Sequence, residues 1–145
     1  MGVNSGNELF RVFENKNFVE SPTYPWINFV PKDIHDRDVV ASAKFRTKGR
    51  FPSLTYYDAK TGTSLWRSSQ TQIGIIHSRC LSDENFLNKI GETNLANPRV
   101  KIFDARPYLN AFANRAKNGG FENCKDYYTS CEIKFCEIAN IHAVN

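Results

Sequence analysis

The large apolar residues of this chain fall in short runs, and the spacing within these runs alternates between that of strands and that of helices. The aromatic run 26–30 lies between prolines and predicts a strand. Acidic residues open the next stretch, 33–44, where apolar positions recur at helical spacing and predict a helix. A Lys-Thr-Gly-Thr turn within 51–67 separates two β-rich runs and predicts a hairpin.

The same alternation continues in the C-terminal half. Ser82 and the acidic residues after it predict a helix that ends at Gly91, and the run 100–103 predicts a strand. A further helix is expected between Asp104 and the glycine pair at 119–120, because a proline stands near its start. One face of that helix is expected to be buried and comprises Leu109, Phe112, Ala113 and Ala116. Another face is expected to carry two amides, those of Asn110 and Asn114.

These elements follow one another as strand, helix, hairpin, helix, strand, helix, strand, the last strand lying in 131–138. The order predicts an α/β fold with a mixed sheet flanked by helices. With 145 residues, 41% of them hydrophobic, the chain is long enough for one domain. Residues 1–20 are polar and mixed and predict an arm or linker, so that the domain is expected to span 21–145.

Composition adds a mild basic character. The net charge of +4 and the pI near 8.9 favour anionic partners such as phosphate groups or an acidic membrane surface. Nothing in the chain matches a nucleic-acid-binding motif, so nucleic acid is not an expected partner. There is no apolar run of roughly 18 residues and no hydrophobic leader, so the expected location is the cytoplasm.

The four cysteines, Cys80, Cys124, Cys131 and Cys136, are expected to be reduced thiols. The spacing of the last three, followed by His142, leaves a zinc site as one alternative and buried core thiols as the other. Cys131 and Cys136 are five positions apart in a strand-like run and are therefore expected on opposite faces. The sequence therefore favours core thiols, and neither a metal nor a cofactor is expected.

Three groups of polar residues are candidates for a site. Lys44, Arg46, Lys48 and Arg50 alternate along the chain, and they predict either a phosphate-binding row of cations or a solvated loop. Arg67, Ser68, Ser69 and Gln70 follow a predicted strand, and they predict either a polar network or a hydrogen-bonded turn. Asp104 is either the cap of the next helix or a participant in chemistry.

Several strings occur together in an order and spacing typical of one family. They are Tyr24-Pro25 with Pro31, A-K-F-R-T-K-G-R-F-P from Ala43, R-S-S-Q from Arg67, D-A-R-P from Asp104, N-A-F-A-N-R-A-K from Asn110, G-G-F-E from Gly119 and N-I-H from Asn140. With these strings the chain resembles the myotubularin-related phosphatase domain over about residues 20–145 and corresponds to its N-terminal part.

The resemblance implies a fold like that of the cysteine-dependent tyrosine phosphatases. It also implies removal of the 3-phosphate from phosphatidylinositol 3-phosphate and phosphatidylinositol 3,5-bisphosphate. The family residues that match Asn114, Asn140 and Ile141 contact the phosphoinositide headgroup. In that setting the support of the pocket is expected from Arg67, Ser68, Ser69, Gln70, Asp104 and Arg106.

The catalytic loop of the family has no counterpart among these cysteines. That loop reads Cys-Ser-Asp-Gly-Trp-Asp-Arg, with a thiolate nucleophile and an Arg six positions later that holds the phosphate. Six positions after the four cysteines stand Phe86, Ser130, Glu137 and His142. The family's loop would lie beyond residue 145, so no catalytic residue is expected in this chain.

The leading hypothesis is a fragment of a phosphoinositide 3-phosphatase that is not active alone. It is expected to be cytoplasmic and to bind peripherally to endosomal-type membranes. The alternative is a catalytically inactive myotubularin-like interaction protein that pairs with another member of the family. An incomplete α/β sheet is expected to leave an unpaired strand edge and an exposed apolar face, which a partner would cover.

Overall fold

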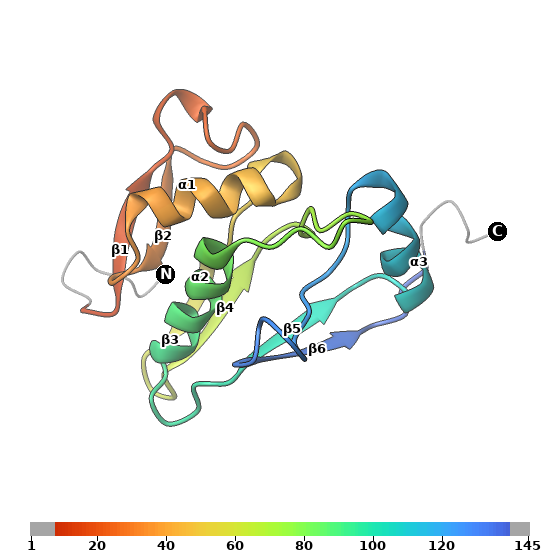
Figure 1. Ribbon diagram of the computed structural model, residues 1–145. Helices are drawn as coiled ribbons and strands as arrows, with labels where there is room; N and C mark the ends of the chain where they lie inside the picture. Colours follow the sequence, from red (N-terminus) through yellow and green to blue (C-terminus); the bar gives the residue numbers. More distant parts are fainter. Residues whose placement is uncertain (1–7, 140–145) are drawn as a thin grey trace.

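The computed structural model describes residues 8–139 (Figure 1). Its N-terminal part is an antiparallel pair, β1 (Phe10–Glu14) and β2 (Ile27–Pro31), in which Val12 lies opposite Phe29. A short 3-10 helix, η1 (Lys16–Phe18), lies in the connection between them. The strand expected at 26–30 is confirmed, and residues 10–14 are its partner. The expected domain boundary at residue 20 stays a prediction.

The middle of the chain confirms the predicted helix and hairpin. Helix α1 (Asp36–Phe45) is followed by η2 (Thr47–Gly49), and the antiparallel hairpin consists of β3 (Ser53–Asp58) and β4 (Thr63–Arg67). The four alternating basic residues do not lie on one extended segment, because Lys44 lies in α1 and the chain then turns through η2. The prediction of a row of cations was therefore wrong.

The C-terminal part alternates helices with a parallel strand pair. Helix α2 (Leu81–Glu92) leads to β5 (Val100–Asp104), which is followed by α3 (Tyr108–Ala113) and the 3-10 helix η3 (Asn114–Lys117). The last strand, β6 (Cys131–Phe135), lies parallel to β5, so that Val100 pairs with Cys131. The chain therefore contains a β-α-β connection after its antiparallel first half.

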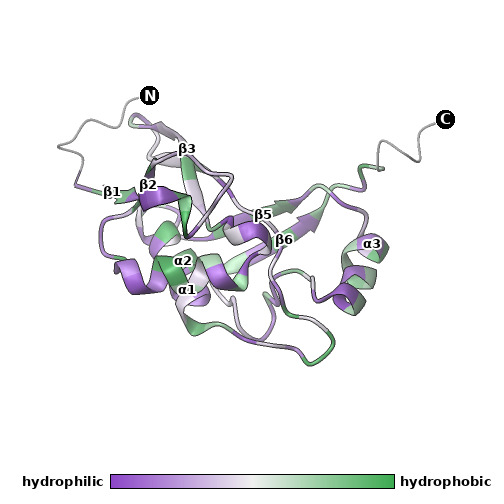
Figure 2. Ribbon diagram, turned by 90° about the horizontal axis from the view of Figure 1, so that it is seen from above, coloured by the Kyte–Doolittle hydropathy of each residue, from purple (hydrophilic) through white to green (hydrophobic). Residues whose placement is uncertain are grey.

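The α/β class is confirmed, but the strands do not form one continuous sheet. In the described residues they form three two-stranded sheets, of which β1-β2 and β3-β4 are antiparallel and β5-β6 is parallel. Both views place α3 at the opposite end of the molecule from β1 and β2 (Figure 1, Figure 2). The molecule is therefore elongated along the direction that joins these ends.

The main core lies where α1, α2 and the first two sheets meet. Val30, Val39, Phe51 and Phe86 are all completely buried there. The rings of Phe51 and Phe13 pack edge to face with centroids 5.4 Å apart, which is a favourable aromatic geometry. A second apolar cluster joins α2 to the parallel pair through Leu87, Ile90, Tyr128 and Cys131.

One long connection links the two ends of the molecule. The segment 68–80 leaves β4, reaches the turn after η3 and returns to α2 (Figure 1). At its far end the backbone N–H of Gly74 donates to the carbonyl oxygen of Gly119 at 3.0 Å. At its near end Thr71 forms an isolated antiparallel bridge with Arg46. This segment therefore brings residues of the R-S-S-Q string to the turn after η3.

Two helix predictions were wrong in detail. The helix expected from 104 to 119 is α3 followed by η3, and Leu109 and Phe112 are 75% and 50% exposed, whereas Ala111 is fully buried. Gly91 does not stop α2, which continues to Glu92. A Cβ atom at Gly91 would lie 2.2 Å from the carbonyl oxygen of Pro98, so glycine serves there for close chain approach.

Within the described part of the chain, none of the helices has the length and apolar character that crossing a membrane requires.

Candidate functional site

Asp104 and Arg106 form the first part of the site, at the carboxyl end of β5. The Asp104 Oδ1 atom accepts hydrogen bonds from the backbone N–H and from the Nε of Arg106, at 3.0 and 2.9 Å. The Arg106 Nη2 atom lies 2.6 Å from Asp104 Oδ2, so the guanidinium is held by both carboxylate oxygens. Asp104 does not cap the next helix, because α3 begins at Tyr108 with no side-chain cap. The cap interpretation was therefore wrong.

Three other segments complete this arrangement around Arg106. Its Nη1 donates to the Gln70 Oε1 atom, and its Nη2 donates to the carbonyl oxygen of Gly120 at 2.9 Å. The Asn114 Nδ2 atom also donates to Gln70 Oε1, at 3.4 Å. We call this set the Arg106 cluster; it comprises the side chains of Gln70, Asp104, Arg106 and Asn114 and the carbonyl of Gly120. Four residues that sequence reasoning placed at the site are thus linked by one chain of hydrogen bonds.

Gly119 explains why the turn after η3 approaches Gln70 so closely. A Cβ atom there would lie 2.7 Å from Gln70 Oε1 and 3.0 Å from both other atoms of the amide group. The backbone N–H of Gly119 donates to the carbonyl oxygen of Asn114 at 2.8 Å and closes the turn. The glycine therefore makes room for the amide that links Arg106 to Asn114.

A second guanidinium, that of Arg46, is completely buried nearby. Its Nε and Nη2 atoms contact the two carboxylate oxygens of Asp83 at 2.7 and 2.8 Å, and its Nη1 lies 2.9 Å from Glu122 Oε1. Ser42 and Tyr128 donate to the two oxygens of Asp83 at 2.5 and 2.8 Å. We call Ser42, Arg46, Asp83, Glu122 and Tyr128 the Arg46 cluster.

The electrostatics of the Arg46 cluster fix its ionisation states. Burial by itself lowers the pKa of Arg46, but the negative charges of Asp83 and Glu122 outweigh it, and the net pKa is raised. Burial and the charge of Asp83 raise the pKa of Tyr128, so its phenol remains a donor. Arg46 is therefore neither a free phosphate ligand nor part of a solvated loop, and both interpretations of it were wrong.

The R-S-S-Q string contributes to both clusters. Ser68 Oγ and the carbonyl oxygen of Ser69 accept hydrogen bonds from Arg46 Nη1 at 3.2 and 2.8 Å. Ser69 Oγ donates to the carbonyl oxygen of Thr47 at 2.7 Å. The side chain of Arg67 is exposed, and its carbonyl oxygen accepts from the Tyr24 hydroxyl at 3.1 Å. The polar-network interpretation is thus confirmed for Ser68, Ser69 and Gln70.

Two residues of the expected site, Asn140 and Ile141, lie outside the described residues. Their contact with a headgroup stays a prediction. Sequence reasoning missed Asp83 and Glu122 as partners of Arg46, and Tyr128 as a partner of Asp83. Glu122 belongs to the G-G-F-E string and Arg46 to the A-K-F-R string, so their joint occurrence was the available signal.

The cysteines are free thiols, and three of them are poorly suited to act as nucleophiles. Burial raises the pKa of Cys124 to about 12 and that of Cys131 to about 11, and it also raises the pKa of Cys80. Cys136 is exposed and lies just beyond β6. Within residues 8–139 no three His, Cys, Asp or Glu side chains are arranged to hold a metal ion.

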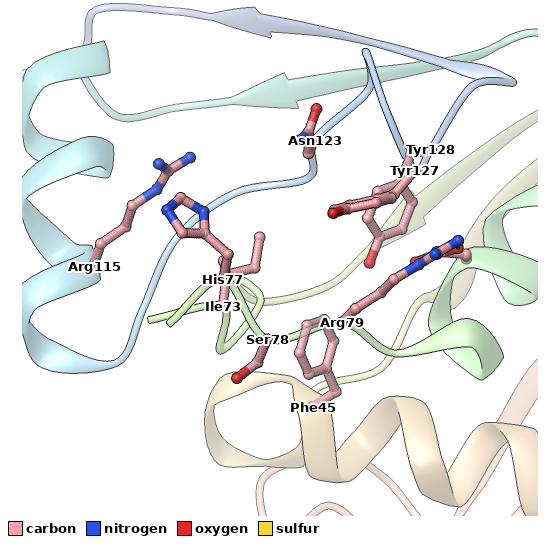
Figure 3. A pocket seen from close by; sticks show the side chains of 10 residues that line it. Phe45, Ile73, His77, Ser78, Arg79, Arg115, Asn123, Tyr127 and Tyr128 are labelled. Atoms are coloured by element: carbon pink, nitrogen blue, oxygen red, sulfur yellow. Dashed lines mark hydrogen bonds and ion pairs between the residues drawn. The ribbon is translucent and has the colours of Figure 1, made fainter. Parts of the chain in front are cut away.

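A small pocket lies between the long connection, the end of α1, η3 and the turn at 123–128. Figure 3 shows His77 and Arg115 on one side of it and Arg79 and Tyr127 on the other. Its volume of about 20 Å³ is close to that of one water molecule, so a phosphate group does not fit. The Arg79 guanidinium is paired with Glu84 at 2.7 Å, and that of Arg115 stacks over Phe112 and Phe121. This pocket is therefore not the headgroup site.

Comparison with known proteins agrees with the motif strings. The myotubularin-like phosphatase domain family matches over residues 1–145. The phosphatidylinositol-3,5-bisphosphate 3-phosphatase MTMR3 of Caenorhabditis elegans is 42% identical over 134 residues, which cover 90% of this chain and 13% of that protein. MTMR2 of Bos taurus, with the same activity in its name, is 37% identical over 139 residues, covering 95% of this chain and 22% of that protein.

MTMR6 of Homo sapiens, also named as a phosphatidylinositol-3,5-bisphosphate 3-phosphatase, is 40% identical over 130 residues, which cover 90% of this chain and 21% of that protein. The chain therefore spans between 13% and 22% of the length of these three relatives. The match includes the first 20 residues, so it extends further than the motif strings did. The chain belongs to the myotubularin-like phosphatase domain family.

Proposed function

We propose that this chain is the N-terminal part of a phosphoinositide 3-phosphatase domain, and that the Arg106 cluster forms one wall of its headgroup pocket. The proposal rests on one observation above all. Gln70 comes from the long connection and the other three residues from 104–114, and a chain of hydrogen bonds runs from Asp104 through Arg106 and Gln70 to Asn114. The proposed fold is that of the cysteine-dependent phosphatases, of which these residues form a part.

The chemistry of the cluster suits an inositol ring better than a bare phosphate. Arg106 is neutralised by Asp104, so the pair orients neighbouring groups and adds little net positive charge. Asn114 is half-buried and offers both an amide donor and an amide acceptor, which match ring hydroxyls. In this proposal Asn114, Asn140 and Ile141 contact the headgroup. Support comes from Arg67, Ser68, Ser69, Gln70, Asp104 and Arg106.

Turnover is proposed to need residues from the rest of the phosphatase domain. A phosphocysteine intermediate requires a thiolate and a nearby Arg that binds the transferred phosphate. The raised pKa values of Cys80, Cys124 and Cys131 oppose thiolate formation. The Cys, Arg and Asp of the catalytic loop would be supplied by the downstream segment. The substrate then sits on a membrane surface, and the proposed location is cytoplasmic and peripheral to endosomal-type membranes.

The test compares the chain alone with the chain continued by the downstream phosphatase segment of C. elegans MTMR3. Phosphate release from dispersed phosphatidylinositol 3,5-bisphosphate is expected only from the continued chain. In that protein Asn114→Ala should lower kcat/KM about tenfold or more, as loss of a hydrogen bond to substrate does. Asn110→Ala, on an exposed position of α3, is the matched control. Equal effects of the two variants, or release by the chain alone, would refute the proposal.

The second candidate function is that of a catalytically inactive partner of another myotubularin-family protein. The favouring observation is the exposed apolar surface at Leu65 and Phe103, which are 60% and 65% exposed and which a protein partner would cover. Co-sedimentation with human MTMR6 separates the candidates. Stable binding to MTMR6, combined with no turnover by the continued chain, supports the partner function. Turnover by the continued chain supports the enzyme.

A further inference from the structure

The far end of the long connection is a short loop with an apolar tip. We call residues 73–78, at this end, the apolar loop. Its Ile75 and Ile76 side chains are 71% and 85% exposed. Figure 2 shows this end of the connection as a hydrophobic loop at the edge of the molecule, beside α3. Two adjacent isoleucines gain free energy when an apolar medium replaces the water around them, so the tip is a candidate for contact with such a medium.

Backbone hydrogen bonds and a buried base hold the apolar loop in one shape. The N–H of Ser78 donates to the carbonyl oxygen of Ile73 at 2.8 Å and closes the loop. Gly74 and His77, on either side of the two exposed isoleucines, both have a positive φ, of 61° and 53°. Ile73 is 6% exposed and packs against Gly120. The exposed isoleucines are therefore presented to solvent by a closed turn that is anchored in the fold.

The apolar loop lies beside the Arg106 cluster. The N–H of Gly74 donates to the carbonyl oxygen of Gly119 at 3.0 Å, and the carbonyl oxygen of the next residue, Gly120, accepts from Arg106 Nη2 at 2.9 Å. Gln70, earlier in the same connection, also accepts from Arg106. A lipid whose headgroup is bound at the Arg106 cluster keeps its acyl chains in the bilayer, so a loop beside this cluster is close to the membrane surface.

The surroundings of the apolar loop carry positive charge. Asn118 lies against the loop, since a Cβ atom at Gly74 would lie 2.6 Å from its Oδ1 atom. The 3-10 helix η3, which ends just before Asn118, supplies Arg115 and Lys117, and Lys117 is exposed. Neither the long connection nor the stretch 105–121 contains an acidic residue. An anionic surface would therefore be attracted to this side of the molecule.

We propose that the apolar loop inserts Ile75 and Ile76 into the apolar layer of a lipid bilayer, while Lys117 contacts anionic headgroups at its surface. An apolar tip beside a cation, in segments without carboxylates, favours a bilayer that contains anionic lipids. The inference rests on the proposed function only for the place of the loop beside the headgroup pocket. It requires neither recognition of a phosphoinositide nor turnover.

Co-sedimentation of the chain with vesicles tests this directly. The vesicles contain equal amounts of phosphatidylcholine and phosphatidylserine and no phosphoinositide. The double substitution Ile75→Ser and Ile76→Ser should lower the partition coefficient about tenfold or more, with the thermal midpoint preserved because both positions are exposed. Leu95→Ser is the matched control and should retain binding; this residue is 86% exposed and lies in the turn after α2. Equal binding by the double variant and the unsubstituted chain would overturn the proposal.

Fluorescence quenching separates insertion from adsorption at the surface. Ile76→Trp places an indole at the tip, and lipids brominated on their acyl chains should quench its added fluorescence. The unsubstituted chain, with Trp26 and Trp66, gives the baseline. Leu95→Trp is the matched control, and its added fluorescence should not be quenched. Absence of added quenching for Ile76→Trp on bound vesicles would show that the tip stays outside the apolar layer, contrary to the proposal.

The role of Lys117 has its own measurement. Lys117→Gln should lower binding to the mixed vesicles roughly fivefold, as expected for one cation at an anionic surface, and should leave binding to phosphatidylcholine alone unchanged. Lys60→Gln, at an exposed residue of the hairpin turn, is the matched control and should have little effect on either. An equal loss for the two variants would assign the effect to net charge and refute a local contact by Lys117.

The same vesicle experiment with the chain continued by the downstream segment of C. elegans MTMR3 tests a protein as the occupant. If the isoleucine substitutions weaken binding of the chain alone but not of the continued chain, the downstream segment covers the loop and the proposal is overturned. Failure of the headgroup proposal is a separate result. Asn114→Ala should leave vesicle binding intact, because the vesicles hold no phosphoinositide, and the isoleucine substitutions should leave hydrolysis of a water-soluble short-chain phosphoinositide by the continued chain unchanged.

Discussion

The Arg106 and Arg46 clusters use the same chemistry in different surroundings. In each, one carboxylate accepts hydrogen bonds from Nε and Nη2 of an arginine, which is the bidentate geometry. The side chains of Arg46 and Asp83 are 0% exposed, whereas those of Arg106 and Asp104 are 26% and 12% exposed. The difference between the clusters is therefore one of burial and not of pairing.

Burial determines what each guanidinium can do. Arg46 has a second carboxylate, Glu122, and polar oxygens of Ser68 and Ser69 around its Nη1, so its hydrogen-bonding capacity is used within the fold. Arg106 has one carboxylate and reaches an amide, Gln70, that also contacts Asn114. The buried cluster joins α1, α2 and the turn before Glu122, whereas the partly exposed cluster can present polar groups to a ligand.

The largest expected effect is that of Arg46→Met. The substitution leaves Asp83 and Glu122 buried without their cation, and breaking a buried pair in this way costs about 3–5 kcal/mol of unfolding free energy. Urea unfolding measures this loss. Arg37→Met, at an exposed residue of α1, is the control and should change stability by less than about 0.5 kcal/mol. A loss below about 1 kcal/mol for Arg46→Met would contradict the role of Arg46 as the cation that stabilises two buried carboxylates.

Arg106→Met should cost less, about 1–2 kcal/mol, because its pair with Asp104 is partly hydrated. The matched control is Arg99→Met, whose partner Glu132 and own side chain are 48% and 58% exposed. That exposed pair should contribute less than about 1 kcal/mol. The same urea experiment ranks Arg46, Arg106 and Arg99 by their contribution to the free energy of unfolding. An Arg106→Met loss as large as that of Arg46→Met would show that the two clusters are structurally equivalent.

Gly119→Ala should perturb the Arg106 cluster with a still smaller change in stability. The new Cβ atom displaces the Gln70 amide, at a cost of about 1 kcal/mol, while the loss of a glycine from the unfolded chain offsets about 0.4–1 kcal/mol. In a Gln70→Ala background the clash is absent, so Gly119→Ala should become neutral or stabilising. A double-mutant cycle measures this coupling. Additive effects of the two substitutions would refute the contact.

Local sequence patterns were sufficient to predict most elements of the fold. The proline-bounded strand β2, the hairpin and the strands β5 and β6 follow from turn residues and alternation, which act over few positions. Periodicity failed for 108–117, where apolar spacing suggested a buried helical face. Ala111 is the one buried residue of α3, so Leu109 and Phe112 are left exposed by tertiary arrangement rather than by their own spacing.

The site could be predicted in part for a related reason. Gln70, Asp104, Arg106 and Asn114 lie in motif strings, and the strings indicated that they belong together before any contact was known. The burial of Arg46 could not be deduced from its neighbours, since Lys44 and Lys48 are exposed. Its partners Asp83 and Glu122 are 37 and 76 positions away. The packing of α1 on α2 brings Asp83 to Arg46, and Glu122 reaches it from the segment after η3.

Alkaline pH should lower the stability of the region around the Arg46 cluster. Burial raises the pKa of Cys131 from 9.0 to about 11, and burial together with Asp83 raises that of Tyr128. The folded state thus retains these protons more tightly than the unfolded state. The contribution of Cys131 to stability is complete below about pH 9 and is lost as the pH rises toward about 11, and that of Tyr128 begins to be lost above about pH 10. Urea unfolding between pH 8 and 11 should show this decline. Cys131→Ala should reduce the slope of the unfolding free energy against pH by the equivalent of at most about one bound proton. Cys136→Ala, at an exposed thiol, is the control and should retain the original slope.

Because the Arg106 cluster holds neither a thiol nor a phenol, amide exchange in η3 should be less affected by this pH change than exchange in α2. A larger effect of pH on η3 than on α2 would contradict this prediction, because it would place the alkaline sensitivity at the Arg106 cluster.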